Sequence, residues 1–211
     1  TNLPVSADYE NAFADAPADA AKNIELAAAT GLAGCSIEDA TGRADDPIYD
    51  LGLAKDRVAA AAEAAHAGAT KLVLTARAEN FLHGRLDLDD TIRRLQAFEK
   101  AGADVLYAPG LRDLATIRTV VSSVGKPVNV VMSHGDPALT LAELSAAGVK
   151  RISVGGSLSR LALASFLRGA REMKDRGGFT WMRETIPGKD LKEVFGKWSG
   201  EPQPKARRAD P

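Results

Sequence analysis

Residues 71–108 decide the fold, because they hold a strand, a helix and a second strand in succession. The stretch opens with the apolar run Lys71-Leu72-Val73-Leu74-Thr75-Ala76 and closes with Asp104-Val105-Leu106-Tyr107-Ala108. Between them, residues 89–101 carry apolar side chains at the three-residue spacing of one helix face, at Ile92, Leu95 and Phe98. Gly102 follows as a helix stop. Nearly continuous apolar runs predict strands buried on both faces, as in a parallel sheet.

The same repeat extends outward in both directions. Further strands are predicted at residues 3–7, 34–37, 127–132 and 151–155. Further helices are predicted at residues 19–30, 53–67, 114–124, 140–147 and 157–174. Strand starts lie about 23 to 37 residues apart, which is the size of a strand–helix–strand unit. The sequence therefore predicts an α/β protein.

An open dinucleotide-binding sheet and a (β/α)₈ TIM-type barrel both produce this alternation. The first strand-to-helix turn lacks the glycine fingerprint of dinucleotide-binding folds, which favours the barrel. Six strands are counted where a barrel needs eight, so we expect the first two βα units to lie upstream of Thr1. We predict a barrel portion at residues 1–178, a helical extension at 179–199 and a flexible tail at 200–211.

The composition favours a soluble cytoplasmic enzyme over a nucleic-acid or membrane protein. The chain has 211 residues, of which 45% are hydrophobic, and a formal net charge of −1. This charge gives no electrostatic reason to expect nucleic acid or an anionic membrane as partner. A single cysteine, Cys35, excludes an internal disulfide framework and fits a reducing compartment. We expect a small-molecule substrate.

Charged residues gather at the predicted carboxyl ends of three neighbouring strands, where barrel enzymes carry their catalytic groups. These residues are Asp8 and Glu10 after the first strand, Glu38 and Asp39 after the second, and Arg77 and Glu79 after the third. Clustered carboxylates repel one another unless a cation lies between them, and Mg²⁺ is a common solution. We predict Mg²⁺ bound directly by Asp8, and through water by Glu10 and Glu38. Arg77 would hold a substrate carboxylate or phosphonate.

These stretches resemble the isocitrate lyase/phosphoenolpyruvate mutase superfamily. The resemblance rests on Leu3-Pro4-Val5-Ser6-Ala7-Asp8-Tyr9-Glu10, Ala33-Gly34-Cys35-Ser36-Ile37-Glu38-Asp39 and Thr75-Ala76-Arg77-Ala78-Glu79, with weaker matches near residues 101–104 and 148–155. It implies a Mg²⁺-dependent lyase or mutase that acts on a small 2-oxo or 2-hydroxy carboxylate or phosphonate. Such enzymes cleave or rearrange a C–C or P–C bond through an enolate-like species, with Arg77 and Glu38 as catalytic residues. It also implies a homo-oligomer, a dimer or tetramer, that exchanges a C-terminal helix.

One departure from that family is clear. Its lyase members follow the Ile-Glu-Asp strand with a loop whose cysteine acts as acid or base. Here the corresponding residues, 40–50, contain no cysteine. Cleavage of isocitrate or methylisocitrate is therefore not expected, and Arg43, Asp46 or Tyr49 could serve a loop that closes over substrate.

Two further positions are candidates for substrate binding. His134 follows a strand end and could act at neutral pH. Gly155-Gly156-Ser157 precedes a helix, where backbone N–H groups could bind an anion. The glycine turn leaves open a different barrel enzyme with a phosphorylated substrate, and the lost loop cysteine leaves open a non-catalytic relative of the family.

Overall fold

The structure, a computed structural model, describes residues 2–68, 71–133 and 136–196. It divides into two compact units. The first holds Pro4–Gly155, and the second holds the residues from Gly156 onward together with those up to Leu3. No helix in the described ranges combines the length and apolar character needed to span a membrane.

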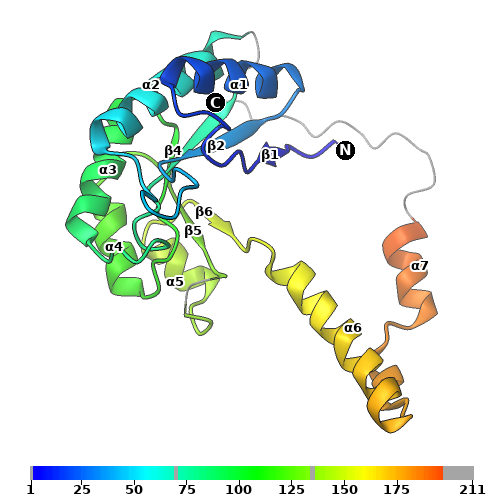
Figure 1. Cartoon of the computed structure of the whole chain (residues 1–211). Helices are drawn as coiled ribbons and strands as arrows, with labels where there is room; N and C mark the ends of the chain where they lie inside the picture. The colour runs from blue at the N-terminus through cyan, green and yellow to red at the C-terminus, as the bar shows by residue number, and fades with distance from the viewer. Residues whose placement is uncertain (1, 69–70, 134–135, 197–211) are drawn as a thin grey trace. The chain divides into compact units, whose positions relative to one another are not determined.

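The first unit is built on a six-stranded sheet in which every neighbouring pair is parallel. The strands follow one another in chain order: β1 (Ser6–Ala7), β2 (Gly34–Glu38), β3 (Val73–Arg77), β4 (Val105–Tyr107), β5 (Val128–Val131) and β6 (Arg151–Ser153). The sheet curls into a half-barrel (Figure 1). The predicted α/β class is therefore confirmed, whereas closure by two further βα units stays a prediction.

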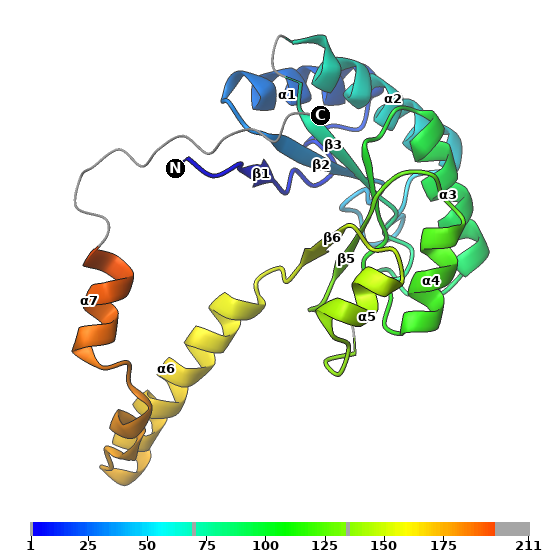
Figure 2. The ribbon, with the colours of Figure 1, turned by 180° about the vertical axis from the view of Figure 1, so that it is seen from behind.

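A helix follows each strand. The helices of this unit are α1 (Pro17–Ala29), α2 (Leu51–Ala67), α3 (Leu88–Lys100), α4 (Leu114–Ser122) and α5 (Leu141–Ala146). Seen from behind, α1 to α4 lie along the convex side of the sheet (Figure 2). Four helix starts are capped by a side-chain oxygen that accepts a hydrogen bond from a backbone N–H, from Asp50, Asp87, Asp113 and Thr140.

The two faces of the sheet differ in chemistry. The residues that point outward towards the helices are apolar and buried, among them Cys35, Ile37, Leu74, Leu106 and Val130. The alternate residues point inward and line cavities, among them Ser36, Thr75, Arg77, Tyr107 and Asn129. Burial on both faces is confirmed for β2 and β5, where the inward side chains of Ser36 and Asn129 are buried as well. These inward side chains are polar, because the side-chain period of two gives the inner face its own set of residues.

Gly102 shows why a glycine ends α3. Its φ of +105° lies in a region that other residues avoid. A Cβ atom built there would also lie only 3.0 Å from the Cβ of Ala62 in α2. The joint that leads into β4 therefore requires glycine both for its backbone conformation and for the close approach of α2.

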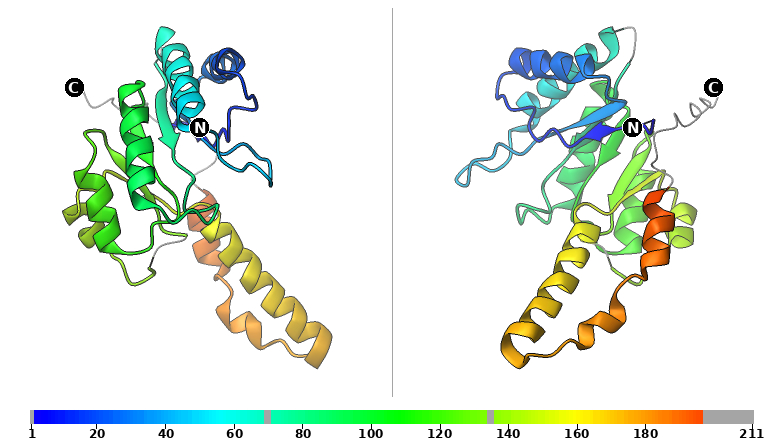
Figure 3. Two further views of the ribbon diagram at one scale, coloured as in Figure 1. Left: turned by 60° about the vertical axis from the view of Figure 1, so that its left-hand side comes forward. Right: turned by 90° about the vertical axis from the view of Figure 1, so that its right-hand side faces the viewer.

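The second unit consists of α6 (Ser157–Arg176), a short 3₁₀ helix (Thr180–Glu184) and α7 (Gly188–Gly196). Figure 3 shows α6 as one uninterrupted helix. Gly169 lets the Trp181 ring approach, since a Cβ atom there would lie 3.2 Å from it. We expected the barrel portion to include α6 and end at residue 178, and this boundary stays a prediction. The predicted tail at 200–211 lies outside the described residues.

We expect truncation of the Phe98 side chain to lower the free energy of unfolding substantially. This side chain is fully buried between α3 and the sheet. Phe98→Ala should lower the free energy of unfolding by about 3–5 kcal/mol, because it loses apolar burial and leaves a cavity. Leu26→Ala on the exposed face of α1 should change it by less than about 0.5 kcal/mol. Denaturant titrations measure both, and equal losses would contradict this description of the core.

Candidate active site

The guanidinium group of Arg77 lies at the end of β3 among three carboxylates. Its Nη1 lies 2.6 Å from Asp8 Oδ1, its Nη2 3.0 Å from Glu38 Oε2, and its Nε 2.7 Å from Glu79 Oε1. The Arg77 side chain is 12% exposed. The structure thus brings together Asp8, Glu38 and Arg77, the three strand-end positions expected to converge, and adds Glu79 to them.

Sheet register explains this convergence. Glu38 and Arg77 are direct partners on the parallel strands β2 and β3, so their side chains leave the same edge on the same face. Asp8 comes just after β1 and is tied to β2 through Ser36. The Ser36 hydroxyl donates to Asp8 Oδ1 at 3.2 Å and accepts from the backbone N–H of Tyr9, also at 3.2 Å.

Burial and charge act against each other in this cluster. Burial raises the pKa of Glu38 above its ordinary value, although the charge of Arg77 partly opposes the shift. Burial also raises the pKa of Glu79 to about 7, again against the pull of Arg77. Desolvation disfavours the charge on Arg77, yet the carboxylates of Glu79, Glu38 and Asp8 outweigh it and raise its pKa. The Arg77 guanidinium therefore stays charged, whereas Glu79 can exchange a proton near neutral pH.

A buried ion pair supports the cluster from the helix side. Asp39 accepts a hydrogen bond from the backbone N–H of Glu79 at 2.8 Å, and its other carboxylate oxygen lies 3.0 Å from Arg94 Nη1. Arg94 also pairs with Asp90 at 2.8 Å and donates to the backbone carbonyl of Tyr49 at 2.9 Å. Both members of the Asp39–Arg94 pair are buried. The pair fixes the backbone of Glu79 beside Arg77.

A cavity of about 200 Å³ opens beside Arg77 on the inner face of the sheet. Its far wall comes from β4, β5 and β6 and carries Tyr107, Asn129, Arg151 and Ser153. The Tyr107 ring lies under the guanidinium, with its centroid 5.2 Å from Arg77 Cζ. Burial raises the pKa of Tyr107 to about 12, so its phenol keeps its proton at neutral pH and can donate a hydrogen bond. The cavity therefore offers the fixed guanidinium of Arg77, the more exposed guanidinium of Arg151 and several neutral polar groups.

Asn129 carries a half-satisfied amide in the wall of this cavity. Its side chain is 2% exposed, and its Nδ2 donates to Ser153 Oγ at 3.2 Å. Its Oδ1 is buried without a hydrogen-bond partner in the part of the chain that is described. An unpaired buried acceptor costs free energy and is a reason to look for an absent ligand or water.

The other predicted site residues have mixed outcomes. Glu10 is exposed, and its backbone carbonyl accepts a hydrogen bond from the N–H of Glu38 at 2.9 Å. Gly155 lines the cavity, whereas His134 lies outside the described residues. Over the described ranges, no group of three or more histidine, cysteine or acidic side chains is arranged to hold a metal ion. The metal-binding and catalytic roles expected of these residues stay predictions.

Sequence reasoning missed parts of the site. Glu79 stood among the strand-end charges but received no role, and Tyr107 and Ser153 were read only as strand residues. The available signal was the spacing of two along each strand. Tyr107 lies two residues after Val105, and Ser153 two residues after Arg151, so each pair points to the same inner face of the sheet. No local pattern in the sequence pointed to the Asp39–Arg94 pair, whose members lie 55 residues apart.

Comparison with known proteins places this fold and site in a family. The sequence profile of the family described as phosphoenolpyruvate phosphomutase matches residues 1–174. A crystal structure of a candidate lyase/mutase from Burkholderia cenocepacia J2315 is 56% identical and superposes with a TM-score of 0.87. That match covers 92% of this chain and 69% of the other.

Two other relatives are more distant. An oxaloacetate decarboxylase of Pseudomonas fluorescens is 31% identical over 166 residues, which are 76% of this chain and 55% of that protein. A phosphonopyruvate hydrolase crystallised with oxalate and Mg²⁺ is 23% identical and shares the fold, with a TM-score of 0.76 over 93% of this chain and 70% of the other. The chain spans 62% of the length of its curated relatives from Mycobacterium tuberculosis. With the profile match over most of its length, the chain belongs to the phosphoenolpyruvate phosphomutase family.

Proposed function

We propose that this chain forms the catalytic part of a Mg²⁺-dependent enzyme that acts on a small 2-oxo or 2-hydroxy carboxylate or phosphonate. The reaction would cleave or rearrange a C–C or P–C bond through an enolate-like intermediate. The observation that carries the proposal is Arg77, held by Asp8, Glu38 and Glu79 at the mouth of a polar cavity. The names of the decarboxylase and hydrolase relatives point to the same class of substrates.

The charge of the site argues for a cation. Asp8, Glu38 and Glu79 surround the Arg77 guanidinium, and Glu10 adds negative charge near Glu38, so this cluster is negative even when Glu79 is protonated. An anionic substrate would be repelled from such a site. A divalent cation would remove that repulsion, and oxygen donors are the ligands that Mg²⁺ prefers.

The donor set fits a Mg²⁺ ion that keeps most of its water. Mg²⁺ commonly uses one or two carboxylates directly and several water molecules. Asp8 suits direct ligation because its side chain is 74% exposed beside the cavity, and Glu10 and Glu38 would act through water. Such a site needs no preformed group of three protein ligands, which agrees with their absence over the described ranges. When bound, Mg²⁺ would supply Lewis-acid stabilisation of an enolate oxygen.

The chain's own residues would bind and orient the substrate. Arg77 presents a planar set of donors that matches a carboxylate or phosphonate. Tyr107 can donate from a phenol that keeps its proton, and the unpaired Oδ1 of Asn129 can accept from a substrate hydroxyl. The 40–50 loop has no cysteine, so the proton-transfer step of the lyase members has no counterpart at that position. The proposal therefore leaves isocitrate-type cleavage aside.

We further propose a homo-oligomer and a complete barrel. The second unit exposes large apolar side chains, including Leu158, Leu161, Phe166, Phe179 and Ile186, which suits burial against a second copy of the chain. The curled sheet and the greater length of the solved relatives support an eight-stranded barrel in the whole protein.

Mg²⁺ binding should depend on Asp8, and substrate binding should depend on Arg77. In calorimetry with the full-length protein, Mg²⁺ should bind, and Asp8→Asn should weaken it by at least about 10-fold, because a direct ligand should matter no less than the groups that orient ligands. Asp19→Asn on the exposed surface of α1 should bind Mg²⁺ as wild type does. Arg77→Lys should keep Mg²⁺ but lose most oxalate binding, because a point charge cannot replace the planar donor set. No Mg²⁺ binding by the wild type would refute the proposed function.

Glu79 should make stability fall as pH rises. Its pKa is 4.5 ordinarily and about 7 in the folded protein, so between these values the folded state holds a proton that the unfolded chain has lost. The free energy of unfolding should therefore decrease with rising pH across this window, by at most about 1.4 kcal/mol per pH unit from this group. Glu79→Gln should show a smaller decrease. Parallel pH profiles of unfolding for the two proteins would contradict this.

Substitutions in α6 can test whether the protein forms an oligomer. Light scattering after gel filtration should give a dimer or tetramer for the wild type. Leu161→Glu combined with Phe166→Glu should shift it towards the monomer, because charges cannot be buried in an apolar interface. Arg160→Glu, on the same helix, serves as the control for added negative charge. A monomeric wild type would remove this part of the proposal.

A further inference from the structure

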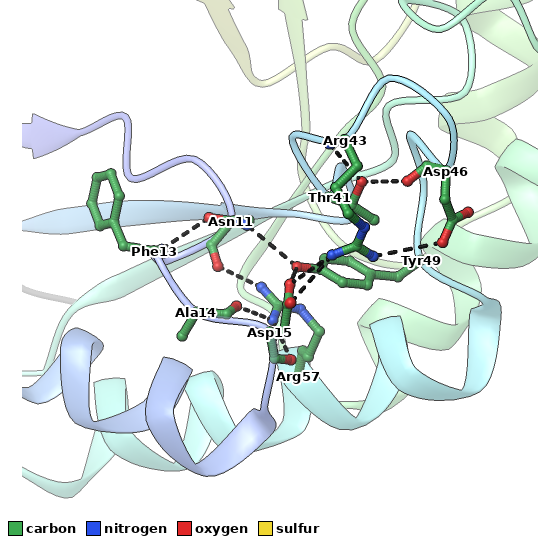
Figure 4. Close-up of polar contacts among 9 residues, drawn as sticks. All are labelled: Asn11, Phe13, Ala14, Asp15, Thr41, Arg43, Asp46, Tyr49 and Arg57. Atoms are coloured by element: carbon green, nitrogen blue, oxygen red, sulfur yellow. Dashed lines mark hydrogen bonds and ion pairs between the residues drawn. The ribbon is translucent and has the colours of Figure 1, made fainter.

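Arg57 is a buried arginine whose donors go to backbone carbonyls of one loop. It lies in α2, and its side chain is 1% exposed. Its Nη1 donates to the carbonyl of Ala14 and, at 2.6 Å, to that of Asp15, and its Nη2 donates to the carbonyl of Asn11 (Figure 4). Burial lowers the pKa of Arg57. A buried charge of this kind is costly, so its three bonds to one turn call for an explanation.

The turn that Arg57 holds has an unfavourable backbone. Glu10, Ala12 and Phe13 have φ values of 47°, 57° and 53°, in the left-handed region that residues other than glycine rarely adopt. Each such residue costs on the order of 1 kcal/mol and persists only where its surroundings enforce it. Arg57 supplies that enforcement, since its donors satisfy carbonyls on both sides of Ala12 and Phe13.

Tyr49 joins this turn to the loop that follows β2. Its ring lies against the Arg57 guanidinium, with Cζ 4.3 Å from the ring centroid. Its hydroxyl donates to the Asp15 carboxylate and accepts from Asn11 Nδ2 at 3.3 Å. Arg43 reaches the same Asp15 carboxylate at 3.2 Å (Figure 4). The loops after β1 and β2 are thus joined into one polar unit by Arg57 and Tyr49.

The held turn directly continues the acidic segment of the active site. Asp8 lies two residues before Glu10, where the left-handed conformation begins. The backbone carbonyl of Glu10 accepts from the N–H of Glu38 at 2.9 Å. The segment is therefore fixed at one end by the pairing of Ala7 with Cys35 of β2 and at the other by the bonds of Arg57 to the Asn11–Asp15 turn, and Asp8 and Glu10 lie between these two anchors.

We propose that Arg57 and Tyr49 are positioning residues that hold the Asn11–Asp15 turn and thereby set Asp8 and Glu10 for cation binding, without touching the cation. This inference rests on the proposed function. Under this proposal, Arg57 and Tyr49 affect the affinity for the cation in addition to the stability of the fold. A lysine at position 57 has a single ammonium group and cannot reach three carbonyls that lie apart, whereas the planar guanidinium can.

The test compares Arg57→Lys and Tyr49→Phe with the wild type in the full-length protein. In Mg²⁺ titrations by calorimetry, Arg57→Lys should weaken binding about 10–100-fold, the range for groups that orient metal ligands, and Tyr49→Phe by a smaller factor. Hydrogen exchange followed by mass spectrometry should show faster exchange over residues 9–16 in both variants. The control is Val120→Ala, a truncation in the core of α4 that lowers stability away from the site. It should leave the Mg²⁺ affinity and the exchange of residues 9–16 unchanged.

Three outcomes are decisive. Mg²⁺ binding by Arg57→Lys within twofold of wild type overturns the positioning role. Equal weakening by Val120→Ala reduces that role to general stability and overturns it as well. If the wild type binds no Mg²⁺, the proposed function fails and so does the link to a cation. In that case, unchanged exchange over residues 9–16 in Arg57→Lys would separately show that Arg57 does not hold the turn.

Discussion

The charge balance around Arg77 is the constraint on which the candidate site depends. One guanidinium, 12% exposed, satisfies three carboxylates that come from the ends of β1, β2 and β3. Without it, Glu38 and Glu79 would be buried acids with no cation beside them, a far costlier arrangement. Burial is the main cause of the raised pKa values of these two acids, and the neighbouring carboxylates add to it. The remaining excess of negative charge makes the site suitable for a hard divalent cation.

The fold makes this arrangement possible because parallel strands deliver their carboxyl ends to one edge. Outward residues such as Cys35 and Leu74 form the core with the helices, and their inward neighbours Ser36 and Thr75 line the cavity. The strand–helix repeat, the helix-ending glycines and the strand-end acids were all readable from the sequence, since each depends on residues close in the chain. Burial of both faces was predicted correctly for β2 and β5, but the polar character of the inner face was not predicted, because short strands of β-branched and small residues resemble apolar runs when their alternation is overlooked.

The parts of the site that could not be predicted depend on contacts distant in sequence. Arg94 meets Asp39 across 55 residues, and Arg57 meets Asn11 across 46. On a predicted helix, either arginine would ordinarily be assigned to the solvent-exposed face, because arginine is rarely buried unless paired. The left-handed conformations of Glu10, Ala12 and Phe13 were equally hidden, since none of these residues is glycine and Asn11 is the one typical turn residue among residues 10–13.

The buried Arg57 and Arg94 and the largely buried Arg77 differ in what balances their charge, and this difference separates their roles. Arg94 pairs with Asp39 and Asp90, and Arg77 with three acids, so in both the carboxylates outweigh desolvation and raise the pKa. Arg57 donates to backbone carbonyls and lies against the Tyr49 ring, with no carboxylate paired to it among the described residues, and burial lowers its pKa. A neutral apolar side chain would fill the same space without that desolvation cost. What such a side chain could not do is hold the carbonyls of a left-handed turn beside the metal-binding acids, which favours a positioning role for Arg57 over simple packing.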